Sequence, residues 1–164
     1  MRIMGIDPGT NITGIGIIEI DERGEPRLCH YGCVRTSRNA KLPHRLGQIY
    51  QGLAEAITRY QPRAVALEDI FYSDNIKTAI VMGEARGVSL LAAVNQGIEP
   101  AEYSPREVKL AVVGRGNASK DQVQFMVRQI LGMKEEIKPA DAADALAVAL
   151  CHYNRMQQQI RMSK

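Results

Sequence analysis

The stretch that decides the fold is PADAADALA, residues 139–147. Pro139 suits the first turn of a helix, and the alanines around the two acids predict a helix that lies close against another layer of the protein. Asp141 and Asp144 stand three residues apart and therefore share one face of this helix. Acids in a first turn also complement the helix dipole, and these residues alone leave that simpler explanation open.

Two further acids end apolar runs earlier in the chain. Asp7 closes the run at 2–6 and Glu68 closes the run at 64–67. Glu68 is favoured over its neighbour Asp69 because it falls in phase with the two alanines of its run. Simpler readings exist for both, because Asp-Pro-Gly forms good turns and Glu68 could mark a strand that leaves the core.

If the three segments converge, four carboxylates share one small volume. Like charges at close range raise each other's pKa or require a cation. Oxygen ligands without nearby cysteine or histidine favour Mg²⁺ or Mn²⁺. The sequence therefore predicts the composition of a two-metal phosphodiester site.

Length and composition indicate one ordinary globular domain. The chain has 164 residues, of which 45% are hydrophobic and 24% charged, and a formal net charge of +3. That mild positive charge permits nucleic acid as a partner without proving it. Three cysteines, no charged leader and no membrane-length apolar window favour a cytoplasmic protein with reduced thiols and no membrane contact.

Hydrophobic periodicity predicts the order β-β-β-α-β-α-β-α-α-α. Strands are expected at about 2–7, 14–20, 26–36, 63–68 and 100–103, and helices at about 42–60, 75–96, 105–113, 119–131 and 139–157. An antiparallel hairpin beside parallel strands gives an α/β fold with a mixed sheet flanked by helices. We expect one domain over 1–157 and a disordered basic tail at 158–164.

Five motifs occur in order over nearly the whole chain: IDPGT at 6–10, LE at 67–68, GEARG at 83–87, VVG at 112–114 and DAADALA at 141–147. Together they resemble the RuvC family of Holliday-junction resolvases. The resemblance implies a ribonuclease-H-like fold with a five-stranded sheet. It also implies a homodimer that nicks four-way DNA junctions at two symmetric positions during recombination and repair, leaving ligatable 5′-phosphate ends. A branch-migration motor of RuvA and RuvB is the implied partner complex.

The resemblance also assigns roles to single residues. It implies two Mg²⁺ ions per active site, for which Mn²⁺ is expected to substitute, and a reaction that requires no side-chain base. The implied catalytic and metal-binding acids are Asp7, Glu68, Asp141 and Asp144. Asp141 is the least fixed of the four, because some family members have histidine at its position.

The DNA contacts implied by the resemblance involve an aromatic residue and two lysines. Phe71 would stack on bases at the junction centre, and Lys109 and Lys120 would approach the DNA backbone. Lys77 and Arg115 are weaker candidates for phosphate contacts. On charge pattern alone the lysines are ordinary surface residues, and Phe71 could be a loop aromatic tucked onto the core.

The helix at about 75–96 is the best candidate for a dimer interface. Its apolar stripe is wide for a helix that covers one side of a sheet; it consists of Ile76, Ala79, Ile80, Gly83, Gly87, Leu90, Leu91 and Val94. Gly83 and Gly87 lie one turn apart and would let two backbones approach closely. The alternative is that these glycines admit a neighbouring helix of the same chain.

Three other functions compete with a junction resolvase. A related nuclease could act on RNA or RNA–DNA hybrid, but Phe71 and the dimer helix disfavour it. A junction-binding protein without chemistry is disfavoured by the four acids. The motif Asp-x-Gly-Thr at 7–10 also resembles the first phosphate loop of actin-like ATPases, which need two lobes and a much longer chain.

Overall fold

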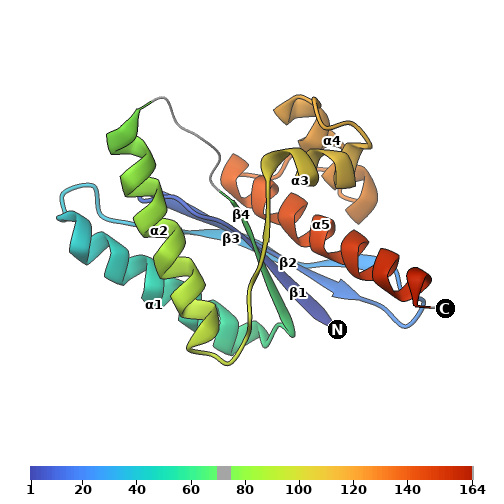
Figure 1. Cartoon of the computed structure of the whole chain (residues 1–164), viewed down its shortest axis with the longest axis horizontal. Coiled ribbons are helices and arrows are strands. Elements are labelled where there is room, and N and C mark those ends of the chain that lie inside the picture. Colours follow the sequence, from blue (N-terminus) through green and yellow to red (C-terminus); the bar gives the residue numbers. More distant parts are fainter. Residues whose placement is uncertain (70–74, 164) are drawn as a thin grey trace.

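A five-stranded mixed sheet forms the centre of the computed structural model, which describes residues 1–69 and 75–163. The strands are β1 (Arg2–Asp7), β2 (Ile12–Ile20), β3 (Pro26–Arg35), β4 (Ala64–Glu68) and β5 (Ala101–Tyr103), in the order β3-β2-β1-β4-β5. β1 lies in the middle, antiparallel to β2 and parallel to β4 (Figure 1). The predicted α/β class and the predicted order of elements are confirmed.

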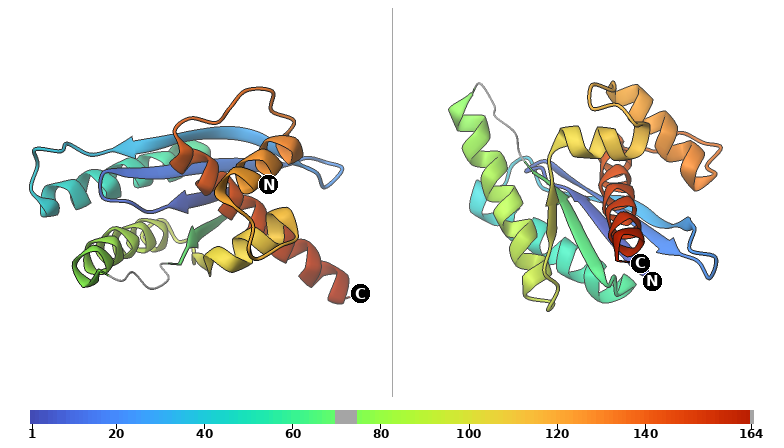
Figure 2. Two further views of the ribbon diagram at one scale, coloured as in Figure 1. Left: turned by 90° about the horizontal axis from the view of Figure 1, so that it is seen from above. Right: turned by 45° about the vertical axis from the view of Figure 1, so that its right-hand side comes forward.

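Helices cover both faces of the sheet, and each face has its own apolar core. The helices are α1 (Leu42–Tyr60), α2 (Ile76–Val94), α3 (Pro105–Val113), α4 (Lys120–Leu131) and α5 (Ala140–Met162). α1 and α2 lie on one side of the sheet, whereas α5 lies on the other with α3 and α4 packed outside it (Figure 2). α5 is therefore sandwiched between the sheet and a second layer of helices.

The expected disordered tail is wrong for most of its length, because α5 continues to Met162. Two hydrogen bonds anchor the helix just before this part. The Tyr153 hydroxyl donates to the Gly24 carbonyl at 2.8 Å, and the Asn154 amide donates to the Ala111 carbonyl at 2.8 Å. Neither α5 nor any other helix in the described ranges is long and apolar enough to cross a membrane.

The sheet presents glycine where α5 crosses it. A Cβ on Gly5 would lie 2.7 Å from the Ala149 nitrogen and nearer still to the Ala145 carbonyl oxygen. A Cβ on Gly16 would lie 2.5 Å from the Leu146 nitrogen, and one on Gly14 would overlap the Asp141 carbonyl. The predicted close contact of the alanine-rich helix with the sheet is thus a contact of backbone against backbone.

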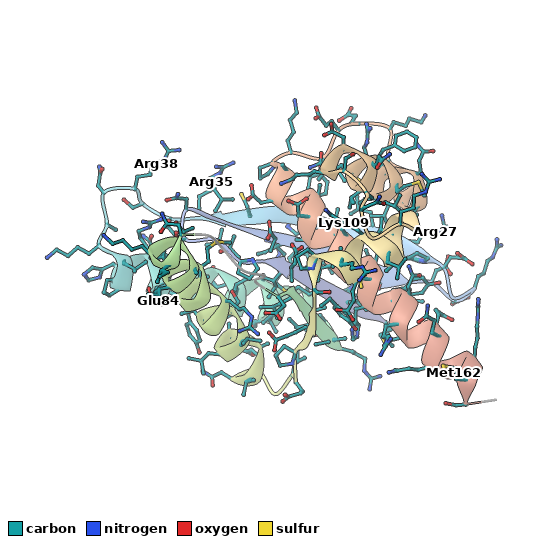
Figure 3. The ribbon with its side chains drawn as sticks, turned by 45° about the horizontal axis from the view of Figure 1, so that its top comes forward. Arg27, Arg35, Arg38, Glu84, Lys109 and Met162 are labelled. Carbon is teal, nitrogen blue, oxygen red and sulfur yellow. The ribbon has the colours of Figure 1, made fainter. Side chains whose placement is uncertain are left out.

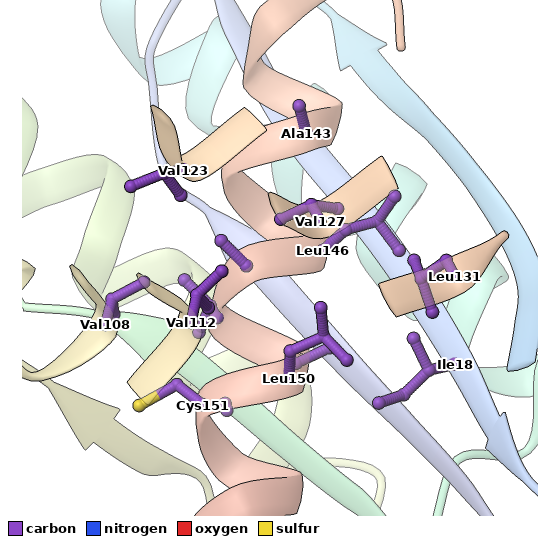
Figure 4. Packing of buried hydrophobic residues seen from close by; sticks show 14 of the residues in the cluster. Ile18, Val108, Val112, Val123, Val127, Leu131, Ala143, Leu146, Leu150 and Cys151 are labelled. Carbon is purple, nitrogen blue, oxygen red and sulfur yellow. The ribbon is translucent and has the colours of Figure 1, made fainter. Parts of the chain in front are cut away.

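Larger side chains of α5 fill the core beside this contact. Leu146 and Leu150 are buried in the same apolar cluster as valines of α3 and α4, such as Val112 and Val127 (Figure 4). Both outer helices begin at a serine cap: Ser119 with Gln122, and Ser104 with Glu107. The caps fix where these two helices start relative to α5.

Replacing Gly5 by alanine should destabilise the fold by about 1–3 kcal/mol, the usual cost of overpacking a filled interior. The added methyl group meets the backbone of α5, which cannot rotate away. Thermal unfolding followed by circular dichroism measures the loss. Gly47→Ala on α1 is the matched control, because open space surrounds that position and alanine favours helix. An unchanged midpoint for Gly5→Ala would show that α5 does not press on β1.

Candidate active site

The four predicted acids gather at one edge of the sheet. β1 and β4 run parallel, so Asp7 and Glu68 at their carboxyl ends lie at the same edge. Gly14 pairs with Asp7 across β1 and β2, and the backbone of Asp141 lies directly over Gly14. The first turns of α5 thus bring Asp141 and Asp144 to the strand ends.

The adjacent acids at the end of β4 belong to opposite faces. Ala66 belongs to the core on the α5 side, and Leu67 to the core on the side of α1 and α2. Glu68, in phase with Ala66, interacts electrostatically with Asp144 on α5. Asp69 instead pairs with Arg86 of α2, with 3.3 Å between Oδ1 and Nε. The choice of Glu68 over Asp69 from periodicity agrees with this arrangement.

Burial and mutual repulsion disturb the ionisation of the two strand acids. The pKa of Asp7 is raised from 3.8 to about 8, mainly by burial. Repulsion from the other three acids, in the order Asp144, Glu68 and Asp141, adds to this rise. The positive charge of Lys120 opposes it. Burial, followed by the charge of Asp144, also raises the pKa of Glu68. These carboxylates therefore share a poorly hydrated space that lacks enough positive charge.

Lys120 supplies part of the missing charge. Its Nζ lies 2.7 Å from Oδ2 of Asp144, and this hydrogen bond raises the pKa of the lysine. In the parts of the chain that the structure describes, no three Asp, Glu, His or Cys side chains are arranged to hold a metal ion together. The donor chemistry nevertheless fits Mg²⁺, because the groups are carboxylates whose repulsion a hard cation would relieve.

A cleft of about 290 Å³ opens beside these acids, between α3, α4 and α5. Glu68 and Asp144 are among the residues that line it, and Lys109 and Lys120 line its rim. Figure 3 shows Lys109 on α3, next to α5. A larger cavity of about 340 Å³ lies farther along α5 and contains none of the four acids, so the chemistry points to the smaller one.

Comparison with known proteins identifies the family of this chain. The model of the family described as crossover junction endodeoxyribonuclease RuvC matches residues 3–152. The chain belongs to the RuvC family. The mixed sheet flanked by helices is accordingly of the ribonuclease-H-like type.

Individual RuvC relatives match over almost their whole length. A crossover junction endodeoxyribonuclease RuvC from Desulforamulus reducens is 52% identical over 153 residues, which is 93% of each chain. The structure of Thermus thermophilus RuvC aligns with a TM-score of 0.88 at 38% identity and covers 97% of each chain. A second structure, of the Thermus protein in complex with a Holliday junction substrate, aligns with a TM-score of 0.87 at 35% identity over 96% of each chain.

The two weaker predicted phosphate contacts of this RuvC-family chain lie outside the cleft. Lys77 is exposed in the first turn of α2, and Arg115 is exposed in the loop between α3 and α4. Neither lines the cleft described above. Phe71 lies outside the described residues.

Arg45 supports the loop that follows Asp7, and sequence reasoning missed it. Its Nε donates to the Thr10 carbonyl and to the Thr36 hydroxyl, both at 3.2 Å, and Nη2 donates to Asn11. The Thr36 hydroxyl also donates to Thr10, at 2.6 Å. Together these bonds hold the loop that follows Asp7 against the start of α1. Periodicity gives no signal for such contacts, because their partners lie far apart in sequence.

The two glycines of α2, the expected dimer helix, have open space beside them. Apart from the adjoining backbone of α2 itself, no atom of the described residues lies within 4 Å of where a Cβ on Gly83 or Gly87 would stand. The alternative that they admit a helix of the same chain is therefore wrong for the described residues. Around them α2 exposes large apolar side chains, with Ile76 at 77%, Ile80 at 57% and Leu91 at 51%; the stripe residues Ala79 and Leu90 are half-buried.

Without divalent cations, Asp7→Asn should be more stable than the parent at about pH 8 and show little advantage at about pH 4. The folded protein keeps the Asp7 proton up to about pH 8, whereas an ordinary aspartate releases it near 3.8. The native state therefore binds more protons across this window, and the contribution of Asp7 to stability falls as pH rises. Asparagine does not ionise, so the Asp7→Asn variant does not lose this stability as the pH rises.

Thermal midpoints of both proteins across this range test the prediction. Glu22→Gln, an exposed acid in the turn between β2 and β3, is the control for loss of one charge. An Asp7→Asn advantage that is constant with pH, or that shrinks toward pH 8, would contradict a raised pKa.

Proposed function

We propose that this protein is a metal-dependent endonuclease that resolves four-way DNA junctions by paired nicks in two opposed strands. The observation that carries the proposal is the carboxylate cluster at the edge of the sheet, beside a cleft rimmed by Lys109 and Lys120. Family membership supports it, since the relatives are named crossover junction endodeoxyribonucleases and a Thermus relative was solved with a Holliday junction substrate.

The acids would act together on two Mg²⁺ ions, with Mn²⁺ as a substitute. Asp7 and Glu68 would contribute from the sheet, and Asp141 and Asp144 from α5. When bound, the ions supply an activated water and stabilise the charge that develops on the leaving oxygen. The protein itself fixes the carboxylates on two strands and one helix, so that they need little reorganisation. Hydrolysis of this kind leaves 5′-phosphate ends that a ligase can seal.

Positive charge around the cleft would hold the DNA backbone. Lys120 and Lys109 both oppose the rise in the pKa of Glu68, which supports a role for them beside the scissile phosphate. We assign weaker phosphate contacts to Lys77 and Arg115, which are exposed. We also assign Phe71 the role of stacking on bases at the junction centre, where a stacked base contributes about 1–3 kcal/mol.

The proposed assembly is a homodimer with two-fold symmetry. A four-way junction presents two equivalent strands, so such a dimer can place one active site on each. The open glycines and exposed apolar residues of α2 support this surface as the interface. We further propose that the dimer works with a RuvA–RuvB branch-migration motor in the cytoplasm, a location that suits the free thiols of Cys29, Cys33 and Cys151.

Cleavage assays distinguish this function from its rivals. Labelled four-way, linear and RNA–DNA hybrid substrates are incubated with the protein, with and without Mg²⁺. We expect symmetric nicks in the four-way substrate only, and only with the metal. Preferential cleavage of the hybrid would favour a nuclease that acts on RNA, whereas binding of the junction without any nicks would favour a binding protein.

Asp7→Asn should abolish nicking while the protein still binds the junction as well as the parent or better. The change removes a metal ligand and also a negative charge that repels phosphate. Gel-shift titration and a cleavage assay on the same substrate measure the two effects, with Glu22→Gln as control. Near-normal Mg²⁺-dependent cleavage by Asp7→Asn would remove this carboxylate from the reaction.

Gly83→Leu or Gly87→Leu should give a folded monomer that has lost paired nicking. Within one protomer there is space for the new side chain, and leucine forms helix better than glycine, which costs roughly 0.8–1 kcal/mol relative to alanine. The loss would therefore come from the interface and not from unfolding. Sedimentation velocity reports the mass, and a cruciform plasmid assay distinguishes paired from single nicks. A parent protein that sediments as a monomer and still makes paired nicks would refute this interface.

A further inference from the structure

Arg86 ties α2 to the edge of the sheet. α2 packs mainly on α1, through alanines such as Ala85 and Ala92, and touches the sheet only lightly. Arg86 reaches across this gap. Its Nε lies 3.3 Å from Oδ1 of Asp69, and its Nη2 donates to Glu102 on β5. One guanidinium thus joins a helix to the ends of two neighbouring strands.

Two contacts hold the end of β4, one through the backbone of Asp69 and one through its side chain. The Asp69 N–H donates to the Tyr103 carbonyl at 2.7 Å, which continues the ladder between β4 and β5. The Asp69 side chain is held by Arg86 on the α2 face. Because successive side chains of an extended chain point to opposite faces, a fixed Asp69 directs Glu68 toward the acids of α5.

The arginine is the less exposed member of both ion pairs. The Arg86 side chain is 27% exposed, less than either carboxylate partner. Its Nε is buried and has no partner of hydrogen-bond geometry among the described residues, so the charge of Asp69 is what compensates it. Arginine can engage two acids at once through its planar fork, which lysine cannot do.

We infer that Arg86 is a positioning residue for the active site: it clamps the end of β4 against α2 and so fixes the direction of Glu68. The inference deepens the proposed nuclease function and rests on it for the activity readout alone. Because the same helix carries the open glycines, Arg86 also fixes the proposed interface helix relative to a carboxylate of the site.

The test compares Arg86→Met, which removes the charge and keeps the stem, with Arg2→Met. Arg2 is the matched control, because it is also a partly exposed arginine paired with a strand glutamate, Glu19, at 3.2 Å. It lies at the start of β1, the end away from the acids. All measurements are made well below the thermal midpoints of both variants, so that global unfolding does not contribute.

Two readouts are expected to move in Arg86→Met and not in Arg2→Met. Hydrogen exchange of the Asp69 amide should become faster relative to that of Ile6 on β1, a result that does not depend on any activity. In junction nicking, the Mg²⁺ concentration for half-maximal rate should rise by about 10-fold or more, as is usual when a group supporting a metal ligand is lost. The dissociation constant for the junction should stay the same.

Asp69→Asn completes the design. If Arg86 acts through Asp69, the double variant should be no worse than Arg86→Met alone in either readout. A lower thermal midpoint for Arg86→Met with unchanged Asp69 exchange and unchanged Mg²⁺ dependence would overturn the inference and leave a stabilising ion pair. If the parent protein nicks no junction, the proposed function fails, and the Asp69 exchange alone decides whether Arg86 clamps β4.

Discussion

The structure depends on how closely α5 approaches β1 and β2. Where a helix normally rests on side chains, here its backbone rests on Gly5, Gly14 and Gly16. This approach puts the first turns of α5 within electrostatic reach of Asp7, which ends the central strand. A layer of ordinary side chains would hold the helix farther out and let water between the carboxylates, which would weaken their interaction. The raised pKa of Asp7 is thus a consequence of packing.

The outer helices add positive charge beside the carboxylates that α5 and the sheet bring together. α3 and α4 pack on the far side of α5 and bring Lys109 and Lys120 to the rim of the cleft. Lys120 follows the serine cap of α4 directly, so the position of one positive charge is set by local backbone chemistry. Two lysines leave four carboxylates undercompensated, and this imbalance makes the cleft receptive to a cation that arrives together with a phosphate.

Much of this could be predicted from the sequence, because regular patterns encode it. Helical and strand periods gave the order of elements, and the phase of β4 separated Glu68 from Asp69. Contacts between distant polar residues have no period, so the Arg86 and Arg45 networks were not predicted. The glycines of β1 and β2 were missed because a strand glycine has meaning only once its neighbour in space is known. The helix also continues past the predicted end of α5, beyond a tertiary anchor at Tyr153, whose bond to Gly24 has no period in the sequence.

The two adjacent acids of β4 show what keeps this strand in register. A slip of one residue against β1 would exchange Glu68 and Asp69, and each network would still receive a carboxylate, so charge alone discriminates poorly between the two pairings. The sizes of the apolar side chains of β4 discriminate well between the two registers. In the native register Ala64 and Ala66 face α5, where the glycine contact leaves little room, while Val65 and Leu67 fill the core beneath α1 and α2. A slipped strand would force the large side chains under α5 and leave cavities on the other face. Alternation of small and large apolar residues, more than the acids themselves, thus determines which carboxylate reaches the active site.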